Sequence, residues 1–190
     1  GLKLPSQQLA GNADDNLAFL DEHQRVVVKP LDGEQGQGVA VDLQSIEEVQ
    51  QAIEAAKHFD SRVLLESFHE GLDLRILVIG FEVVAAAIRR PAEVVGDGHH
   101  SIGALIEAQS RRRQAATGGE SKIPLDHETQ RTLHAAGYDY SSILPAGEHL
   151  FVRRTANLHT GGTLEDVTAI LHPTLRDAAI KAARALDIPV

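Results

Sequence analysis

The stretch VVVKPLDGEQGQGVAV, residues 26–41, places an apolar run, a lysine and three spaced glycines directly before a second apolar run. The first run is β-branched, and Val39, Val41 and Leu43 alternate with other residues in the second. This pattern predicts two paired strands joined by a glycine loop, rather than a strand that leads into a helix.

The order of residues in this stretch excludes the two commonest phosphate-binding loops. A P-loop has its lysine after the glycines, and a Rossmann turn opens a helix with Gly-x-Gly-x-x-Gly. Here Lys29 precedes Gly33, Gly36 and Gly38. Two interpretations stay open: a glycine-rich surface hairpin, or a hairpin whose backbone N–H groups approach a polyphosphate while Lys29 supplies a point charge.

The composition excludes several classes of protein. The chain has 190 residues, a formal net charge of −9 and no cysteine. An acidic chain is unsuited to a broad nucleic-acid surface, and without cysteine it cannot form disulfides, thiolate metal sites or iron–sulfur clusters. No apolar run reaches the roughly 18 residues that span a bilayer, and residues 1–5 lack the features of a signal peptide. We therefore expect a cytoplasmic protein without nucleic-acid or membrane partners.

Hydrophobic periodicity predicts helices alternating with a mixed or antiparallel sheet. A capping box at Ser45 and Glu48 starts a helix, and residues 74–88 form a hairpin. Residues 110–121 lack periodicity and are expected to form a mobile loop. Further elements are a short helix near residues 17–20, a strand over 62–68, a short helix from Ser101, a helix over 127–136, a strand over 150–152 and a helix from Pro173. A seam near residue 60 divides the chain into lobes of residues 1–60 and 61–190.

Charged side chains on the strands after the glycine hairpin are the candidate functional groups. Asp73 and Arg75 share a strand face because strand side chains repeat every two residues. With Glu66 they form either surface ion pairs or a nucleotide site, in which carboxylates accept ribose hydroxyls and guanidinium groups contact phosphates. The paired cations Arg89-Arg90 and Arg153-Arg154, at the ends of apolar strands, are either solvated strand ends or part of a cationic cluster with Lys29.

Two other kinds of chemistry lack their sequence patterns. His99 and His100 are adjacent, so they do not face one point, and no His-Glu-x-x-His helix is present. We therefore predict no histidine-bound metal site. Serine hydrolase chemistry is unsupported as well, because the chain has no Gly-x-Ser-x-Gly elbow.

Four blocks of sequence carry a resemblance to a known family. They are VVVKPLDGEQGQGV, LLESFHEGLDLRILV, RRPAEVVGDG and RTANLHTGG, in this order along the chain. Together they resemble the ATP-grasp ligases, of the cyanophycin synthetase and N-acetylglutaminylglutamine synthetase type. The resemblance covers the chain from about residue 1 to its end. It implies an α+β fold in which a nucleotide is clamped between two lobes with mixed or antiparallel sheets.

The resemblance also implies roles for individual residues. Lys29 would contact the phosphates, beneath a covering loop formed by Gly33, Gly36 and Gly38. Glu66 would lie beside the adenine, with the backbone of Ser67, Phe68 and His69 at its edge, and Asp73 would bind the ribose. Lining the phosphate and acyl-acceptor region would be Arg75, Arg89, Arg154 and Asn157.

The implied chemistry transfers the γ-phosphoryl group of ATP to a carboxylate, after which an amine attacks the acyl phosphate and forms an amide. Such a reaction depends on positioning and charge stabilisation and needs no nucleophilic side chain. In the family Mg²⁺ is held by a Gly-x-Asp strand and a Glu-x-Asn segment, which we expect beyond Val190. The missing methionine and the apolar stretch Leu186–Val190 also indicate an excised, C-terminally truncated piece.

Truncation would leave the isolated chain inactive, although its parent would be a ligase acting on amino-acid or peptide substrates. An exposed sheet edge would favour association between copies, so a homo-oligomer is one expected state. The alternative from another class is a nucleotide-binding or interaction module without catalysis.

Overall fold

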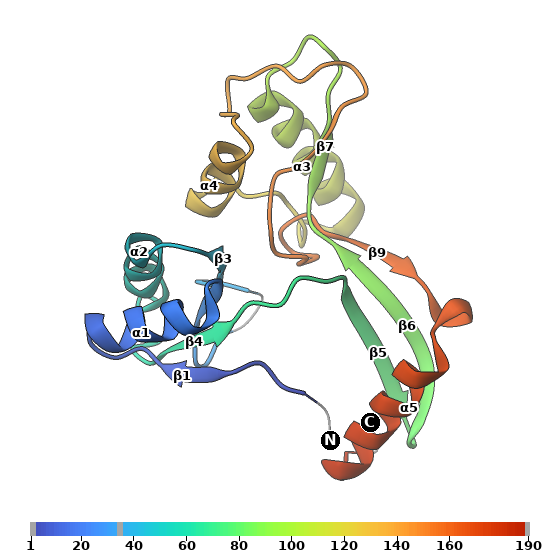
Figure 1. The fold of residues 1–190 in the computed structure, drawn as a ribbon. Coiled ribbons are helices and arrows are strands. Elements are labelled where there is room, and N and C mark those ends of the chain that lie inside the picture. Colours follow the sequence, from blue (N-terminus) through green and yellow to red (C-terminus); the bar gives the residue numbers. More distant parts are fainter. Residues whose placement is uncertain (1–2, 34–35, 189–190) are drawn as a thin grey trace. The chain divides into compact units, whose positions relative to one another are not determined.

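The computed structural model describes residues 3–33 and 36–188 and shows two compact units, Lys3–Gly71 and Leu72–Val190 (Figure 1). Glu34 and Gln35, in the predicted glycine loop, lie outside the described residues, as do the two residues at each end. Every strand pair is antiparallel and helices accompany the sheets, so the α+β class with antiparallel sheets is confirmed.

The first unit is built on a four-stranded sheet with the order β1-β4-β2-β3. Its elements are β1 (Gln7–Leu9), α1 (Ala13–His23), β2 (Val26–Pro30), β3 (Ala40–Leu43), α2 (Ile46–Ala56) and β4 (Val63–Ser67). β2 and β3 form the hairpin predicted from the opening stretch, and β4 pairs with β2 along its whole length.

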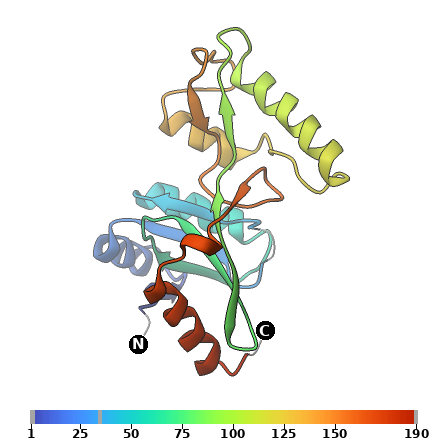
Figure 2. The same ribbon diagram turned by 90° about the vertical axis from the view of Figure 1, so that its right-hand side faces the viewer.

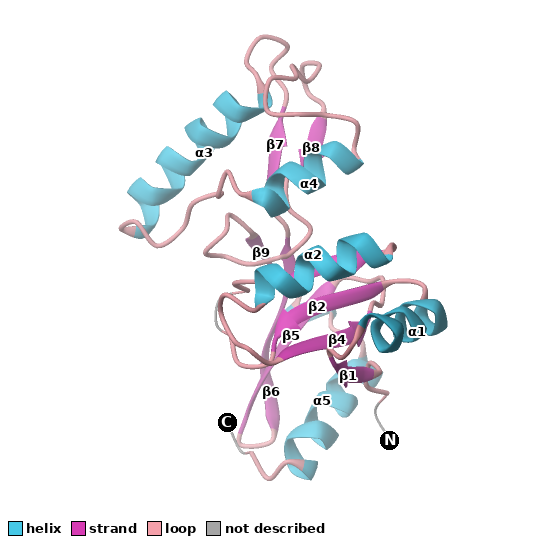
Figure 3. Ribbon diagram, turned by 90° about the vertical axis from the view of Figure 1, so that its left-hand side faces the viewer, coloured by secondary structure: helices cyan, strands magenta, loops and turns pink. Residues whose placement is uncertain are grey.

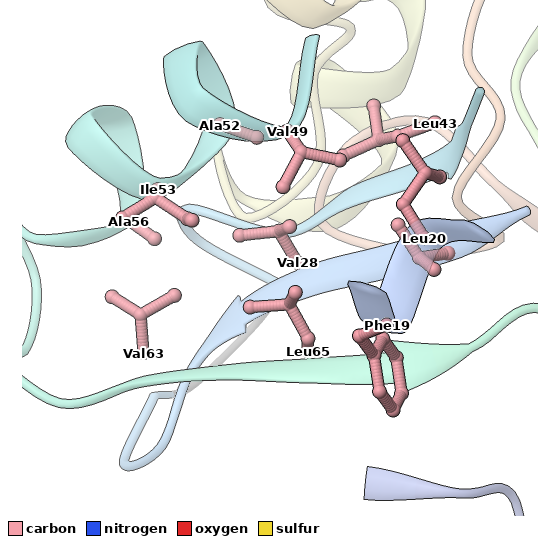
Figure 4. Packing of buried hydrophobic residues seen from close by; sticks show 11 residues of the cluster. Phe19, Leu20, Val28, Leu43, Val49, Ala52, Ile53, Ala56, Val63 and Leu65 are labelled. Carbon is pink, nitrogen blue, oxygen red and sulfur yellow. The ribbon is translucent and has the colours of Figure 1, made fainter. Parts of the chain in front are cut away.

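Both helices of this unit cover one face of the sheet, and the apolar core lies beneath them (Figure 4). Val26, Val28 and Leu65 are fully buried there, because alternate strand residues point to the same side. The predicted capping box starts α2: Ser45 Oγ accepts from the Glu48 N–H, and the Glu48 carboxylate accepts in return from the Ser45 N–H.

The second unit contains a three-stranded sheet with the order β5-β6-β9 (Figure 2). Its elements are β5 (Asp73–Ile79), β6 (Glu82–Arg90), β9 (Thr163–Asp166), the 3₁₀ turn η1 (Thr168–Ile170) and α5 (Pro173–Ala185). The predicted hairpin of residues 74–88 is β5 and β6, which turn at Gly80 and Phe81. Pro173 is in the first turn of α5, where its fixed φ suits a helix start.

A further part of the second unit consists of two helices and a pair of short strands (Figure 3). These elements pack around an apolar cluster that is separate from the core of the first unit. They are β7 (Glu93–Val95), α3 (Ile102–Thr117), α4 (His127–Ala135) and β8 (His149–Phe151). Ile102, Ile106, Leu133, Leu144 and Val152 are fully buried in this cluster. Asp126 caps α4, as the sequence predicts.

The prediction of a mobile loop over residues 110–121 is wrong for its first part, because α3 continues to Thr117. Arginine, glutamine and alanine have high helix propensity, so this segment extends the helix although it has no apolar stripe. Gly118, at φ 63°, ends it in the left-handed conformation that glycine adopts readily.

The boundary between the units falls at Gly71–Leu72 instead of the expected seam near residue 60. β4 follows that seam in sequence, but its pairing with β1 and β2 places it in the first unit. The short strands β1, β7 and β9 have too few residues to show a period. Leu186 and Asp187 form a turn, and the last two residues of the strand expected there lie outside the described part.

The extension of α3 can be tested at Arg112, which is exposed and lies well inside the helix. Arg112→Pro should lower the free energy of unfolding by about 3 kcal/mol, and Arg112→Gly by about 1 kcal/mol, since both disfavour a helix interior. Chemical denaturation measures both values, with Arg112→Ala as the control that keeps helix propensity. Equal stability of the proline and alanine variants would contradict a helix at this position.

Candidate functional site

Lys29 and Glu66 lie on the face of the four-stranded sheet opposite the helices. They alternate with Val28 and Leu65, whose side chains are buried in the core. Lys29 Nζ is 2.5 Å from Glu66 Oε2, and Gln7 Nε2 on β1 donates to Glu66 Oε1 at 2.8 Å. Side chains from three neighbouring strands therefore meet in one polar cluster.

Opposing effects set the pKa of Glu66. Burial raises the pKa of this carboxyl, but the hydrogen bonds from Lys29 and Gln7 and the charge of Lys29 together lower it below its usual value. The Glu66 side chain is 16% exposed and that of Lys29 32%, so water only partly screens the pair. Glu66 is consequently an ionised acceptor at neutral pH.

The glycine turn begins directly beyond Lys29 and Pro30. Gly36 and Gly38 have φ of 72° and 68°, a left-handed conformation that other residues rarely adopt. A Cβ at Gly38 would lie 2.7 Å from a ring carbon of Phe59 and 3.0 Å from Pro30, so a side chain there would also meet steric conflict. Gly33 has no such backbone requirement.

The segment after β4 holds the residues expected at the base edge. Ser67 Oγ is buried and accepts from the Ser6 N–H at 3.0 Å, and it lies 3.1 Å from Nε2 of the exposed His69. The guanidinium of Arg25 stacks over the Phe68 ring, 4.5 Å from its centroid. The backbone N–H of Phe68 donates to the Arg25 carbonyl oxygen.

In the second unit, Asp73, Arg75 and Arg89 form an ionic cluster on β5 and β6. Asp73 and Arg89 are directly opposite in the strand register. Arg75 Nε donates to Asp73 Oδ1 at 2.9 Å, while Arg89 Nη2 and Nε donate to Oδ2 at 2.6 and 3.1 Å. The expectation that Asp73 and Arg75 share a strand face agrees with this contact.

The other paired arginines have different surroundings. Arg90 contacts Glu165 on β9, away from Asp73. Arg153 is 6% exposed and donates to Asp126 and Thr129 at the start of α4. Arg154, the neighbour of Arg153, is half-buried on the segment that follows β8.

Asn157 shapes the turn that follows. Its side-chain oxygen accepts from the His159 N–H at 2.9 Å, and its backbone oxygen accepts from the Thr160 and Gly162 N–H groups. This turn leads into β9 at Thr163. Asn157 therefore has a clear local structural role.

A buried polar cluster surrounds Arg153. Burial raises the pKa of Glu128, and the positive charges of Arg131 and Arg153 oppose that rise. Arg153 Nε lacks a hydrogen-bond partner among residues 3–33 and 36–188. This cluster joins the start of α4 to the end of β8.

The adjacent histidines His99 and His100 lie in a local turn around Asp97. The backbone N–H and ring of His100, and the backbone N–H of His99, hold the pKa of Asp97 well below its usual range. His100 Nδ1 lies 2.6 Å from Asp97 Oδ2. Within the described part of the chain, no group of three or more histidine and acidic side chains is arranged to hold a metal ion.

Gln7 contacts Glu66 and Arg25 contacts Phe68, but neither residue was among the site residues predicted from the sequence. Gln7 is on a strand of only three residues, and its contact with Glu66 joins positions 59 apart in the chain. Arg25 gave one local signal, a cation directly before a β-branched run. Its contact with Phe68 depends on the β2–β4 pairing, which one sequence does not specify.

Comparison with known proteins identifies a domain family and several relatives that this chain resembles. Residues 3–139 match the family model "Prokaryotic glutathione synthetase, ATP-grasp domain". A cyanophycin synthetase from Trichormus variabilis is 40% identical over 151 residues, 78% of this chain and 17% of that protein. The glutathione biosynthesis bifunctional protein GshAB from Clostridium perfringens is 34% identical over 173 residues, 88% of this chain and 22% of that protein.

A solved structure agrees with these matches. The bifunctional glutathione synthetase from Pasteurella multocida superposes with a TM-score of 0.51 at 26% identity, over 97% of this chain and 26% of that one. The chain thus spans about one sixth to one quarter of the length of these relatives. No helix in the described ranges has the length and apolarity to cross a membrane.

The lowered pKa of Glu66 predicts a pH-dependent contribution to stability. The contribution is fully present above the usual carboxyl pKa of 4.5 and is lost as the pH falls through the lower folded-state value. Glu66→Gln should therefore be less stable than the unsubstituted chain at pH 7, and the two should converge below that value. Urea denaturation at several pH values measures this, with Glu54→Gln in the exposed pair with Lys57 as control. A gap between the curves that persists at low pH would contradict the assignment.

Proposed function

This chain belongs to the ATP-grasp domain family of the prokaryotic glutathione synthetases, and from this we propose that it carries the nucleotide site of an ATP-dependent carboxylate–amine ligase. One observation carries the proposal: the Lys29–Glu66–Gln7 cluster lies on a sheet face directly before a glycine turn. A cation, an ionised acceptor and side-chain-free backbone are the groups that an adenine nucleotide requires.

We assign the nucleotide's parts to residues of the first unit as follows. Lys29 Nζ donates to phosphate oxygens, either in place of Glu66 or in addition to it. Gly36 and Gly38 bring backbone N–H groups close to the phosphates, because glycine has no side chain to keep the ligand away from the backbone. Gly33 gives the same loop freedom to move over the ligand.

The base has its own partners in this assignment. Glu66 then accepts from the exocyclic amine of adenine. The backbone of Ser67, Phe68 and His69 meets the edge of the base. Backbone groups are suited to this task because they are fixed by the β4 strand that precedes them.

Residues of the second unit bind the ribose and charged groups. Asp73 accepts hydrogen bonds from the ribose hydroxyls. Arg75 and Arg89 do not occupy all the lone pairs of a carboxylate, so acceptor sites are left for the ribose. The two arginines are held near by Asp73 and supply charge for the phosphate and acyl-acceptor groups. We assign Arg154 and Asn157 to the same region.

The reaction proposed is a two-step amide synthesis. A substrate carboxylate oxygen attacks the γ-phosphorus of ATP, ADP leaves, and an acyl phosphate forms. An amine then attacks the acyl carbon, phosphate leaves with the C–O bond electrons, and the amine loses a proton. Arginine and lysine charges stabilise the phosphoryl group, so no nucleophilic side chain is required.

Magnesium serves such reactions by neutralising the phosphate oxygens. The residues described for this chain do not include a carboxylate set arranged to hold it, so we assign no magnesium ligand here. The named relatives make cyanophycin and glutathione. We therefore infer amino-acid or peptide substrates for the reaction.

Nucleotide binding should stabilise the chain against heat. ADP or Mg·ATP at about 100 times its Kd should add about 2.7 kcal/mol to the free energy of unfolding. Lys29→Ala should lose most of this gain, because the phosphates lose their cation. Thermal unfolding with and without nucleotide measures the effect, and Lys57→Ala, which removes an exposed ion pair in α2, is the matched control. Equal stabilisation of the two variants would contradict the role of Lys29.

Catalysis is tested separately from binding. The chain is incubated with Mg·ATP, an amino acid and hydroxylamine, which converts an acyl phosphate to a hydroxamate. Hydroxamate that depends on ATP and on the amino acid supports the ligase reaction. Nucleotide-dependent stabilisation without hydroxamate would show that this chain binds the nucleotide and does not catalyse the reaction by itself.

The ribose assignment of Asp73 gives a further prediction. The unsubstituted chain should bind ADP about tenfold more tightly than 2′,3′-dideoxy-ADP, as expected for hydrogen bonds to a charged acceptor. In Asp73→Asn this preference should largely disappear. Calorimetric titration provides the Kd values, and Glu165→Gln, which removes the carboxylate of the Arg90 ion pair, is the control. If Asp73→Asn kept the full preference, Asp73 would not be the ribose ligand.

A further inference from the structure

Arg25, directly before β2, is not assigned to the nucleotide site and contacts three side chains, those of Asp42, Phe68 and Glu70. Its Nε donates to Asp42 Oδ1 on β3 at 2.6 Å, and its Nη1 is 3.3 Å from Glu70 Oε2. Its guanidinium also covers the Phe68 ring. One side chain thus joins β3 to the segment that follows β4.

Asp42, the partner of Arg25, has a left-handed backbone. Its φ is 59°, in the left-handed region that only a few per cent of non-glycine residues occupy. Its side chain is 12% exposed and accepts from Arg25 and from Gln44 Nε2. A strained backbone persists only where surrounding contacts hold it, and the Arg25 ion pair is such a contact.

The segment Phe68–Gly71 ends the first unit and has few contacts of its own. His69 and Glu70 are exposed, and no strand pairing continues beyond Ser67. The Phe68 N–H donates to the Arg25 carbonyl oxygen at 2.9 Å, so both the backbone and the side chain of Arg25 hold this segment.

We propose that Arg25 is a positioning residue that fixes Phe68–Gly71 and thereby determines which base the site accepts. This inference rests on the proposed function, in which the backbone of residues 67–69 meets the base edge. Hydrogen-bond recognition discriminates between bases only when the partner groups are held in place. Arg25 holds them by stacking on Phe68 and by pairing with Asp42, which is itself anchored in the β2–β3 hairpin.

The test compares ADP and GDP, because they differ only in the base. Arg25→Ala should reduce the ratio of ADP to GDP affinity about fivefold, the effect of losing a partly desolvated cation–π contact. Arg25→Lys, which keeps the charge near Asp42 and Phe68, should restore part of the ratio. Lys57→Ala should leave it unchanged. Calorimetric titration with each nucleotide supplies the affinities.

Hydrogen exchange provides a readout that needs no nucleotide. In Arg25→Ala the backbone amide of Phe68, which donates to the carbonyl oxygen of residue 25, should exchange faster, while those of β4 keep their protection. If that variant fails to fold, Asp42→Asn replaces it, because asparagine tolerates the left-handed backbone and removes only the charge of the pair. For Asp42→Asn we expect, as for Arg25→Ala, faster hydrogen exchange and a lower ratio of ADP to GDP affinity.

The outcomes separate this inference from the proposed function. Loss of selectivity with faster exchange at the Phe68 amide supports it. An unchanged ADP to GDP ratio in a variant that still binds ADP overturns the inference and leaves the nucleotide site intact. An equal loss for both nucleotides shows a purely structural role and also overturns it. Failure of the unsubstituted chain to bind either nucleotide overturns the proposed function, and the selectivity role with it.

Discussion

The alternation of side chains across the sheet of Lys3–Gly71 is the constraint on which the candidate site depends. Val28 and Leu65 face the helices and are completely buried. Because successive strand residues point to opposite faces, the next residue on each strand must face the other way. The side chains of Lys29 and Glu66 therefore both lie on the sheet face opposite α1 and α2. A shift of one residue in the β2–β4 register would turn one of the two strands over and place its charge alone in the core, where desolvation costs several kcal/mol per ion.

The charged groups assigned to the nucleotide are already paired with one another. Lys29 contacts Glu66, and Arg75 and Arg89 contact Asp73. Such pairs hold long side chains in one place at little net energy, since partly exposed ion pairs contribute only about 0–1 kcal/mol. A phosphate can consequently replace a carboxylate as partner without a large loss, which suits a site that must bind and release its ligand.

Local signals in the sequence predicted much of this structure. The glycine hairpin, the capping box at Ser45, the hairpin of β5 and β6 and the helix after Asp126 each have a chemical signature within a few residues. The strands β1, β7 and β9 have no such signature, because three or four residues show no period and their pairing depends on distant partners. α3 was cut short in the prediction because its last turns have helix propensity but no apolar stripe.

The same distinction between local and distant contacts explains the candidate site. Lys29, Asp73 and the glycines follow from the sequence because their neighbours in the chain reveal their setting. Gln7 and Arg25 do not, since each acts across the β-sheet on a residue more than 40 positions away. Both contacts lie at the end of the β2–β4 pair where Val26 is opposite Ser67: Gln7 contacts Glu66, and Arg25 contacts Phe68. A site built on a strand is therefore completed by residues whose importance only the strand pairing reveals. Substitution of Gln7 or Arg25 would change the positions of Glu66 or Phe68, although every residue of the recognised motifs would still be present.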